Sequence, residues 1–212
     1  MSDDLVYAER LATGDAAGLL VLHHGRGADE FALLPLADML DPQLRLHVVT
    51  PRAPLALADE SGFHWYVSRR VGYPDADTFH DAYRALARLH DRVWERFGVA
   101  PDQTVLGGFS LGSGMSYSLG LGADRPPPAG ILAFSGAIPA VDGWKPDVPR
   151  STAVFAAHGR SDPIVDVALA RAANQLLDDA GMHVEYRESD LGHAVDPAHI
   201  RAAAEWLERV IP

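Results

Sequence analysis

Hydrophobic residues along the chain fall into two alternating patterns. Short apolar runs rich in β-branched residues predict strands, over residues 18–25, 44–51, 103–110, 130–136, 151–159 and 182–189. Longer segments, in which apolar residues recur every three or four positions, predict helices, over residues 29–40, 78–97, 111–121, 163–180 and 196–210. The 78–97 segment has the clearest helical period, and Asp29 is the expected N-cap of the first helix.

This alternation predicts an α/β fold. Helical crossovers join consecutive strands in parallel, so we expect a mostly parallel central sheet with helices on both faces. Strands covered on both faces are continuous apolar runs rather than alternations, as they are here. The N-terminal stretch LVYAERLA (residues 5–12) is expected to add an antiparallel edge strand.

Three segments lack either pattern and are expected to be loops: residues 51–77, 123–129 and 137–150. The chain shows no internal repeat and no composition shift that would mark a domain boundary. We therefore expect residues 1–212 to form one domain, with no separate lid domain.

Composition narrows the function. The chain has 212 residues, 48% of them hydrophobic, a formal net charge of −11 and no cysteine. This charge disfavours nucleic acid and anionic membranes as partners, and the missing cysteines exclude disulfides and thiolate zinc sites. The acidic N-terminus does not resemble a secretory signal and no apolar stretch is long enough to span a bilayer. We expect a cytoplasmic protein without integral membrane association; its oligomeric state, a homodimer included, stays open.

Polar residues directly after the predicted strands carry the candidate chemistry. In an open parallel sheet, ligands bind beyond the carboxyl ends of the strands. Ser110 follows one strand within GGFSLGSG, Asp162 follows another within HGRSDP, and His193 follows the last within LGHAVDP. The pattern G-x-S-x-G is short, so its strand-before, helix-after context and its downstream partners must decide its meaning.

These three residue types have complementary roles. A serine hydroxyl is a weak nucleophile at neutral pH and needs a base to remove its proton. A free histidine has a pKa of about 6.5 and is mostly neutral at pH 7, so it suits that role. A carboxylate fixes the imidazole tautomer and stabilises the imidazolium. We predict Ser110 as nucleophile, His193 as base and Asp162 as the orienting acid; the alternative for Ser110 is a plain turn serine.

Other candidates for the base and the acid are less favourable. His183 lies within a predicted strand and His199 within a helix. Asp166 lies one turn into the next helix, and Asp190 is too close to His193 in sequence to reach across to its Nδ1 atom. Asp162 could instead serve as an N-cap.

An oxyanion hole requires N–H donors aimed at the developing negative charge. We expect the backbone N–H of Leu111, directly after the nucleophile, and that of Arg26 in the loop HGRG, with Gly27 as second choice for the latter. His24 is expected to brace this loop. His23 and His24 are a poor metal pair, because neighbours on a strand point to opposite faces. No metal or cofactor is expected.

Taken together, the motifs HGRGADE, GGFSLGSG, HGRSDPIVD and LGHAVDP resemble the phospholipase/carboxylesterase family of α/β-hydrolases, over about residues 19–210. The resemblance implies a single-domain α/β-hydrolase without a lid and a triad of Ser110, Asp162 and His193. Acyl-protein thioesterases of this family tend to have a polar residue where this chain has Leu111, and the H-G-x-G-x-D-E loop looks more like the small-ester branch.

Two groups of residues have open roles. Phe63, Trp65 and Tyr66 in the 51–77 loop, and Trp144 in the 137–150 loop, either wall a substrate cleft or anchor their loops to the body of the protein. Ser113 and Gly114 are expected to serve only the packing of the helix after the nucleophile.

The sequence therefore predicts a carboxylesterase that hydrolyses small-molecule esters of small or medium acyl chains through an acyl-enzyme. The alternatives are an acyl thioesterase or lysophospholipase, a peptidase or amidase with the same triad, and a non-catalytic binding protein on this fold.

Overall fold

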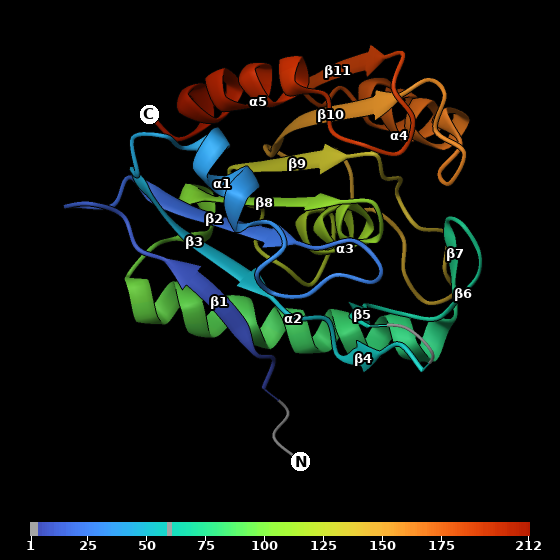
Figure 1. Cartoon of the computed structure of the whole chain (residues 1–212), viewed down its shortest axis with the longest axis horizontal. Helices are drawn as coiled ribbons and strands as arrows, with labels where there is room; N and C mark the ends of the chain where they lie inside the picture. The colour runs from blue at the N-terminus through green and yellow to red at the C-terminus, as the bar shows by residue number, and fades with distance from the viewer. Residues whose placement is uncertain (1–3, 59–60) are drawn as a thin grey trace.

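A seven-stranded sheet runs through the centre of the molecule (Figure 1). The computed structural model describes residues 4–58 and 61–212. In spatial order the strands are β1 (Tyr7–Arg10), β3 (Leu46–Pro51), β2 (Gly18–His23), β8 (Thr104–Phe109), β9 (Gly130–Phe134), β10 (Ala153–Gly159) and β11 (Val184–Ser189). All neighbours pair in parallel except β1, which pairs antiparallel with β3, Tyr7 opposite Pro51. The expected mostly parallel sheet and its antiparallel edge strand are confirmed.

Helices cover both faces of the sheet. Helices α1 (Leu34–Leu40) and α5 (Pro197–Val210) pack on one face. Helices α2 (Ala76–Phe97), α3 (Leu111–Gly120) and α4 (Val167–Asp179) pack on the other. Strand β2 shows how the sheet serves both layers: Leu20 and Leu22 belong to the α1/α5 core, whereas Leu19 and Val21 belong to the α2/α3 core. This two-sided burial explains the continuous apolar runs.

Helix α1 is shorter than the predicted helix over 29–40. Residues before Leu34 form turns, in which the Asp29 carboxylate accepts a hydrogen bond from the N–H of Phe31 at 2.9 Å. Asp29 therefore caps a turn, and Leu33 occupies the N-cap position without a side-chain hydrogen bond. Helix α4 likewise begins later than predicted, because Asp166 accepts from Ala168 N–H as its N-cap.

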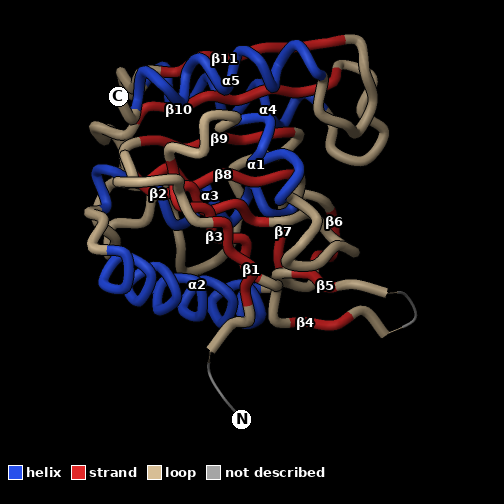
Figure 2. The backbone as a smooth tube through the Cα atoms, turned by 60° about the vertical axis from the view of Figure 1, so that its left-hand side comes forward, coloured by secondary structure: helices blue, strands red, loops and turns tan. Residues whose placement is uncertain are grey.

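The 51–77 segment has more structure than a loop. It contains two small antiparallel sheets, β4 (Leu55–Ala56) with β5 (Phe63–His64), and β6 (Ser68–Arg70) with β7 (Tyr73–Pro74). A single 3₁₀ turn over Pro101–Gln103 precedes β8. In Figure 1, the arrowheads of β8, β9 and β10 point toward the side of the molecule where β6 and β7 lie. Figure 2 shows β4, β5, β6 and β7 gathered on one side of the molecule. The 51–77 segment is thus placed beside the carboxyl ends of the parallel strands.

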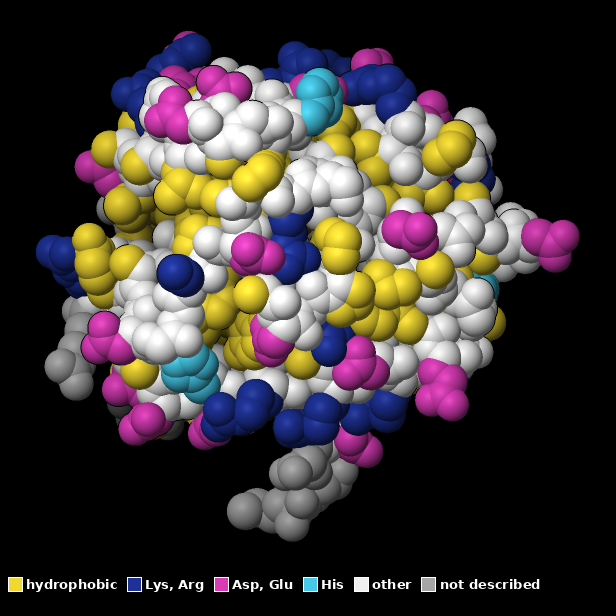
Figure 3. All heavy atoms as spheres, turned by 180° about the vertical axis from the view of Figure 1, so that it is seen from behind, with side chains coloured by type: hydrophobic (Ala, Val, Ile, Leu, Met, Phe, Trp, Pro, Cys, Tyr) yellow, Lys and Arg dark blue, Asp and Glu magenta, His cyan; other side chains and the backbone are white. Residues whose placement is uncertain are grey.

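The surface carries both signs of charge. On the face drawn in Figure 3, acidic and basic side chains are interspersed among hydrophobic ones. Within residues 4–58 and 61–212, no helix is long and apolar enough to cross a membrane.

Candidate active site

Ser110 occupies a sharp turn between β8 and α3. Its backbone has φ +55° and ψ −118°, a left-handed φ that is rare for a residue with a side chain. The turn is held by a hydrogen bond from Ser110 N–H to the carbonyl of Phe134 on β9, at 2.9 Å. Backbone strain of this kind clusters at functional sites. The turn presents the Ser110 hydroxyl at the carboxyl edge of the sheet.

Two glycines permit α3 to approach the sheet closely. A Cβ atom on Gly108 would lie 2.5 Å from the carbonyl carbon of Gly112. A Cβ atom on Gly112 would lie 1.9 Å from the carbonyl oxygen of His23 on β2. Both distances are impossible contacts, so the glycines of G-x-S-x-G are required by packing around the turn.

Ser110, His193 and Asp162 lie in one hydrogen-bonded chain. The Nε2 atom of His193 is 2.9 Å from Ser110 Oγ, and its Nδ1 atom is 2.7 Å from Asp162 Oδ2. The three residues follow β8, β11 and β10 respectively. The side chain of His193 is 19% exposed and that of Asp162 is 0% exposed, so the chain of hydrogen bonds runs from an accessible imidazole to a buried carboxylate.

The Asp162 carboxylate is held by its own turn. Its Oδ1 atom accepts hydrogen bonds from the N–H groups of Ile164, at 2.8 Å, and Val165, at 2.9 Å. Burial raises the pKa of Asp162, but the hydrogen bonds from His193, Val165 and Ile164 outweigh burial and leave that pKa below its ordinary value. Asp162 is therefore ionised at neutral pH. Its N-cap alternative does not apply, because Asp166 caps α4.

His158, at the end of β10, is a neighbour that the sequence did not single out. Its buried Nε2–H donates to the carbonyl of Val165 at 2.8 Å and lies 3.4 Å from Asp162 Oδ2. His158 thereby ties the turn that carries Asp162 to the strand before it.

The predicted oxyanion donors border the same site. Arg26 and Leu111 both line a pocket next to Ser110. Leu111 is the first residue of α3, where backbone N–H groups lack partners within the helix and the helix dipole favours negative charge. The N–H of Gly27 donates to the carbonyl of Phe63 at 2.9 Å. The Gly27 N–H is thus already engaged within the protein.

This pocket has a volume of about 150 Å³ and a largely apolar lining. Its lining comes from α3, from the segment after β9, from the β6–β7 hairpin and from the turn after Asp162. Besides Arg26, Ser110 and Leu111, the lining residues are Tyr66, Ser68, Val71, Gly72, Gly114, Gly136, Ala137, Pro139, Ile164 and Val165. A larger cavity, of about 710 Å³, lies between the N-terminal segment and α2 and contains none of the triad. Because Ser110 lines the smaller pocket and not the larger one, we take the smaller pocket as part of the candidate site.

The sequence matches the Phospholipase/Carboxylesterase family over residues 11–211. The chain belongs to this family. Among its relatives, the esterase YpfH of Escherichia coli (strain K12) is 27% identical over 200 residues, which cover 93% of this chain and 84% of that protein. Acyl-protein thioesterase 1 of Neurospora crassa is 30% identical over 139 residues, so the match spans 59% of this chain and about half, 54%, of the thioesterase.

Solved structures of related proteins have the same fold. A Bacillus cereus carboxylesterase superimposes with a TM-score of 0.85 at 22% identity, covering 97% of this chain and 94% of that one. Esterase PE8 superimposes with a TM-score of 0.81 at 27% identity, covering 98% and 99%. The predictions of an α/β-hydrolase fold and of a carboxylic ester hydrolase from the phospholipase/carboxylesterase family are confirmed.

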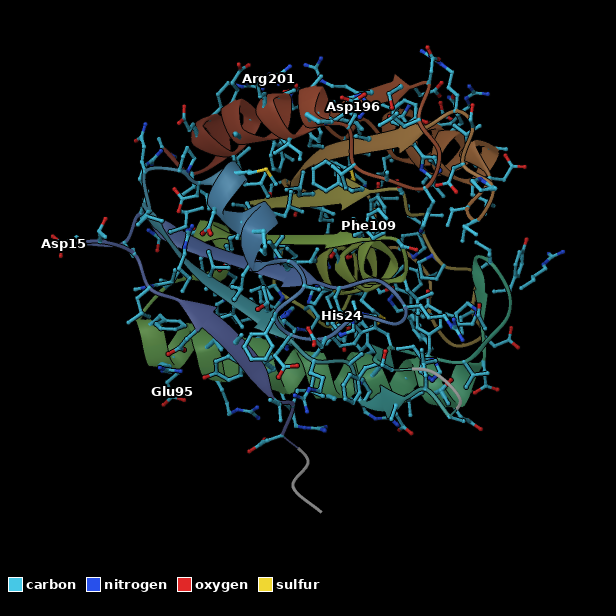
Figure 4. The ribbon with its side chains drawn as sticks, in the orientation of Figure 1. Asp15, His24, Glu95, Phe109, Asp196 and Arg201 are labelled. Carbon is cyan, nitrogen blue, oxygen red and sulfur yellow. The ribbon has the colours of Figure 1, made fainter. Side chains whose placement is uncertain are left out.

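His23, the last residue of β2, and His24, the first residue of the HGRG loop, have separate, buried surroundings. His24 accepts a hydrogen bond from Ala53 N–H at Nε2, at 3.0 Å, and donates from Nδ1 to the carbonyl of Gly25, at 2.7 Å. It braces the loop as expected. His23 instead contacts Ser116 and His90. Figure 4 shows His24 and Phe109 near the carboxyl ends of β2 and β8, and the Phe109 ring packs 4.8 Å from the ring of His193.

The four aromatic residues proposed as cleft walls divide between two locations. Tyr66 lines the pocket beside Ser110. Trp65 is completely buried and donates from Nε1 to the carbonyl of His24 at 2.8 Å, so it anchors the 51–77 segment to the HGRG loop. Phe63 lines the larger cavity, and Trp144 packs against Phe79 in the core, with ring centroids 6.1 Å apart. Neither Phe63, Trp65 nor Trp144 is among the described residues that line the pocket.

Sequence reasoning missed most of the pocket. Gly114, expected only to pack α3, borders it. Ser113 does serve packing, because its hydroxyl lies 2.7 Å from the Gly108 carbonyl and 2.8 Å from that of Phe134. Gly136 and Pro139 follow β9, and the rule that ligands bind beyond strand ends would have found them. The small apolar residues of the β6–β7 hairpin, Val71 and Gly72, carry no comparable sequence signal.

Proposed function

We propose that this protein hydrolyses carboxylic esters with short acyl chains through an acyl-enzyme on Ser110. The observation that carries the proposal is the continuous hydrogen-bonded chain from Ser110 through His193 to the buried Asp162 carboxylate, opening on an apolar pocket. Membership of an esterase family supports the same chemistry.

In the first half-reaction, His193 Nε2 accepts the Ser110 proton as Oγ attacks the ester carbonyl carbon. Asp162 holds the His193 Nδ1–H and stabilises the imidazolium that forms. The N–H groups of Leu111 and Arg26 are the proposed donors to the tetrahedral oxyanion. His193 then returns its proton to the leaving alkoxide oxygen, the C–O bond breaks, and the acyl group stays on Ser110. Water, deprotonated by His193, hydrolyses this acyl-enzyme by the same steps.

The pocket takes the acyl part of the ester. His193 must protonate the leaving oxygen, so the alcohol lies on the His193 side of Ser110. His193 does not line the pocket in the described part of the chain, whereas Ser110 and Leu111 do. A volume of about 150 Å³ corresponds to roughly five water molecules of liquid, which fits an acyl chain of a few carbons.

Replacing the nucleophile tests the proposal. Ser110→Ala is expected to lower kcat for p-nitrophenyl butyrate by roughly 10⁴-fold or more, because no other group forms the acyl-enzyme. Circular dichroism should be unchanged. The matched control is Ser151→Ala, an exposed serine before β10, which should retain the full rate. A Ser110→Ala protein with the wild-type rate would exclude this mechanism.

Thioesters are a second candidate substrate class. The similarity to acyl-protein thioesterase 1 of Neurospora crassa favours them, while Leu111 departs from the polar residue that such enzymes tend to have. Comparing kcat/KM for p-nitrophenyl butyrate and a butyryl thioester, with the matched amide beside them, separates ester, thioester and amide hydrolysis.

A further inference from the structure

We propose that Tyr66 selects the substrate: its hydroxyl donates a hydrogen bond to an oxygen atom within the acyl chain, so the preferred acyl groups carry an ether, carbonyl or hydroxyl oxygen. This inference rests on the proposed function, because it concerns the acyl pocket of the same site.

The Tyr66 hydroxyl has no partner in the protein. The residue is only 4% exposed, and its ring packs against Phe79 with centroids 5.8 Å apart. Across residues 4–58 and 61–212 no side chain or backbone group hydrogen-bonds to its hydroxyl oxygen. The neighbouring Trp65, by contrast, has its N–H paired with the His24 carbonyl. The hydroxyl oxygen is also absent from the described polar atoms that are both buried and unpaired, so it is accessible from the pocket that Tyr66 lines. A ligand oxygen in that pocket would give this donor the hydrogen bond that the protein does not supply.

Gly114 locates this hydroxyl within the pocket. A Cβ atom on Gly114 would lie 3.1 Å from the Tyr66 hydroxyl oxygen. Gly114 is four residues after Ser110, and residues at this spacing share one face of a helix, roughly 6 Å apart along its axis. The hydroxyl therefore lies about one helical turn beyond the nucleophile, where an acyl chain on Ser110 would run.

The other polar groups of the pocket are poor alternatives to Tyr66 as hydrogen-bond donors to a neutral oxygen of the acyl chain. The Ser68 hydroxyl already donates to the carbonyl of Arg70, at 2.8 Å. Ser110 is engaged by His193. Arg26 is exposed at the pocket's border, whereas Tyr66 lies inside. Burial raises the pKa of Tyr66, so its hydroxyl stays protonated and remains a donor.

The experiment compares Tyr66→Phe with the wild type on matched p-nitrophenyl esters in which one CH₂ is replaced by oxygen. The pairs are butanoate with methoxyacetate, pentanoate with 3-methoxypropanoate, and hexanoate with 4-methoxybutanoate. The wild-type to variant ratio of kcat/KM is taken for each ester, which cancels the inductive effect of the oxygen on its intrinsic reactivity. We expect this ratio to be roughly three- to tenfold higher for the oxygen member than for the alkyl member of at least one pair.

The control is Tyr117→Phe, which removes a buried hydroxyl on the same helix as Gly114 but away from the pocket lining. It should affect both members of each pair equally. Equal ratios for all pairs in Tyr66→Phe would overturn the inference. If Tyr66→Phe does not fold, the wild type alone provides the test. Each of its kcat/KM values is divided by the rate constant for hydroxide-catalysed hydrolysis of the same ester, and this normalised value must be higher for the oxygen member of at least one pair. Absence of such a preference in every pair would overturn the inference. If Ser110→Ala loses activity while Tyr66→Phe gives equal ratios for both members of every pair, the proposed function stands and only the role of Tyr66 is overturned.

Discussion

Asp162 is the most constrained member of the proposed triad. Its side chain is 0% exposed, its Oδ1 atom accepts from two backbone N–H groups, and only Oδ2 faces His193. An acceptor fixed in this way requires a proton on Nδ1 of His193, which leaves Nε2 free to accept the Ser110 proton. The geometry thus sets the tautomer that general-base catalysis needs.

Asp162→Asn is expected to lower kcat by about 10⁴-fold, because the two backbone donors would hold the amide oxygen and turn the NH₂ group toward His193. An NH₂ group facing Nδ1 favours the wrong imidazole tautomer. The measurement is kcat for p-nitrophenyl butyrate, with Asp166→Asn, an exposed helix cap, as the matched control. A loss of less than tenfold would show that another carboxylate orients His193.

The hydrogen-bonded arrangement of the three proposed triad residues could be predicted from the sequence, whereas the pocket could not. Ser110, Asp162 and His193 each follow a recognisable strand, and parallel strands bring their carboxyl ends to one edge. Trp65 was a candidate wall because it lies in an aromatic loop, yet its indole N–H pairs with the His24 carbonyl inside the protein. Only long-range contacts distinguish it from Tyr66, its neighbour in sequence.

At the scale of elements, α3 makes two different glycine contacts. Gly112 faces the backbone of β2, and Gly114 faces the Tyr66 hydroxyl in the pocket. We expect Gly112→Ala to force α3 away from the sheet and cost about 3 kcal/mol, the upper end of overpacking. For a chain of this length the melting temperature would then fall by about 6–12 °C.

Gly114→Ala should instead remain folded and change specificity. Its methyl group would enter the acyl pocket, so kcat/KM should fall more for p-nitrophenyl hexanoate than for the acetate. Thermal unfolding and the ester panel, measured on both variants, check the contrast. Equal melting temperatures for the two variants would contradict the assigned packing of Gly112.

The order and type of the main elements could be predicted because each has enough residues for its period to show. Short elements did not have that signal. Strands β4 to β7 have two or three residues each, and their pairing depends on contacts within the 51–77 segment. Helix α1 begins at Leu34 rather than near Asp29, because Asp29 caps a turn with the same side-chain hydrogen bond that would cap a helix.

At the scale of the whole molecule, a buried histidine pair joins the sheet to the helical layer behind the nucleophile. His23 on β2 donates from Nδ1 to the Ser116 hydroxyl on α3 at 2.8 Å, and its Nε2 lies 3.3 Å from Nε2 of His90 on α2. Burial lowers the pKa of His90 to about 3. Burial, and after it the repulsion that His90 and His24 exert when they are protonated, also lowers the pKa of His23 well below its ordinary value.

These two histidines should make the fold acid-sensitive. Unfolded histidines bind protons below about pH 6.5, whereas folded His90 stays neutral down to about pH 3. The unfolded state therefore binds more protons in this window, so the free energy of unfolding decreases as pH falls, by about 1.4 kcal/mol per pH unit for each histidine. The free energy of unfolding, measured with urea at several pH values, should depend on pH less steeply in His90→Leu than in the wild type, by about 1.4 kcal/mol per pH unit. Measurement at about pH 8, where histidines are neutral in both the folded and the unfolded state, isolates the packing cost of the substitution. If the free energy of unfolding depends on pH equally in the two proteins, His90 does not cause the loss of stability in acid.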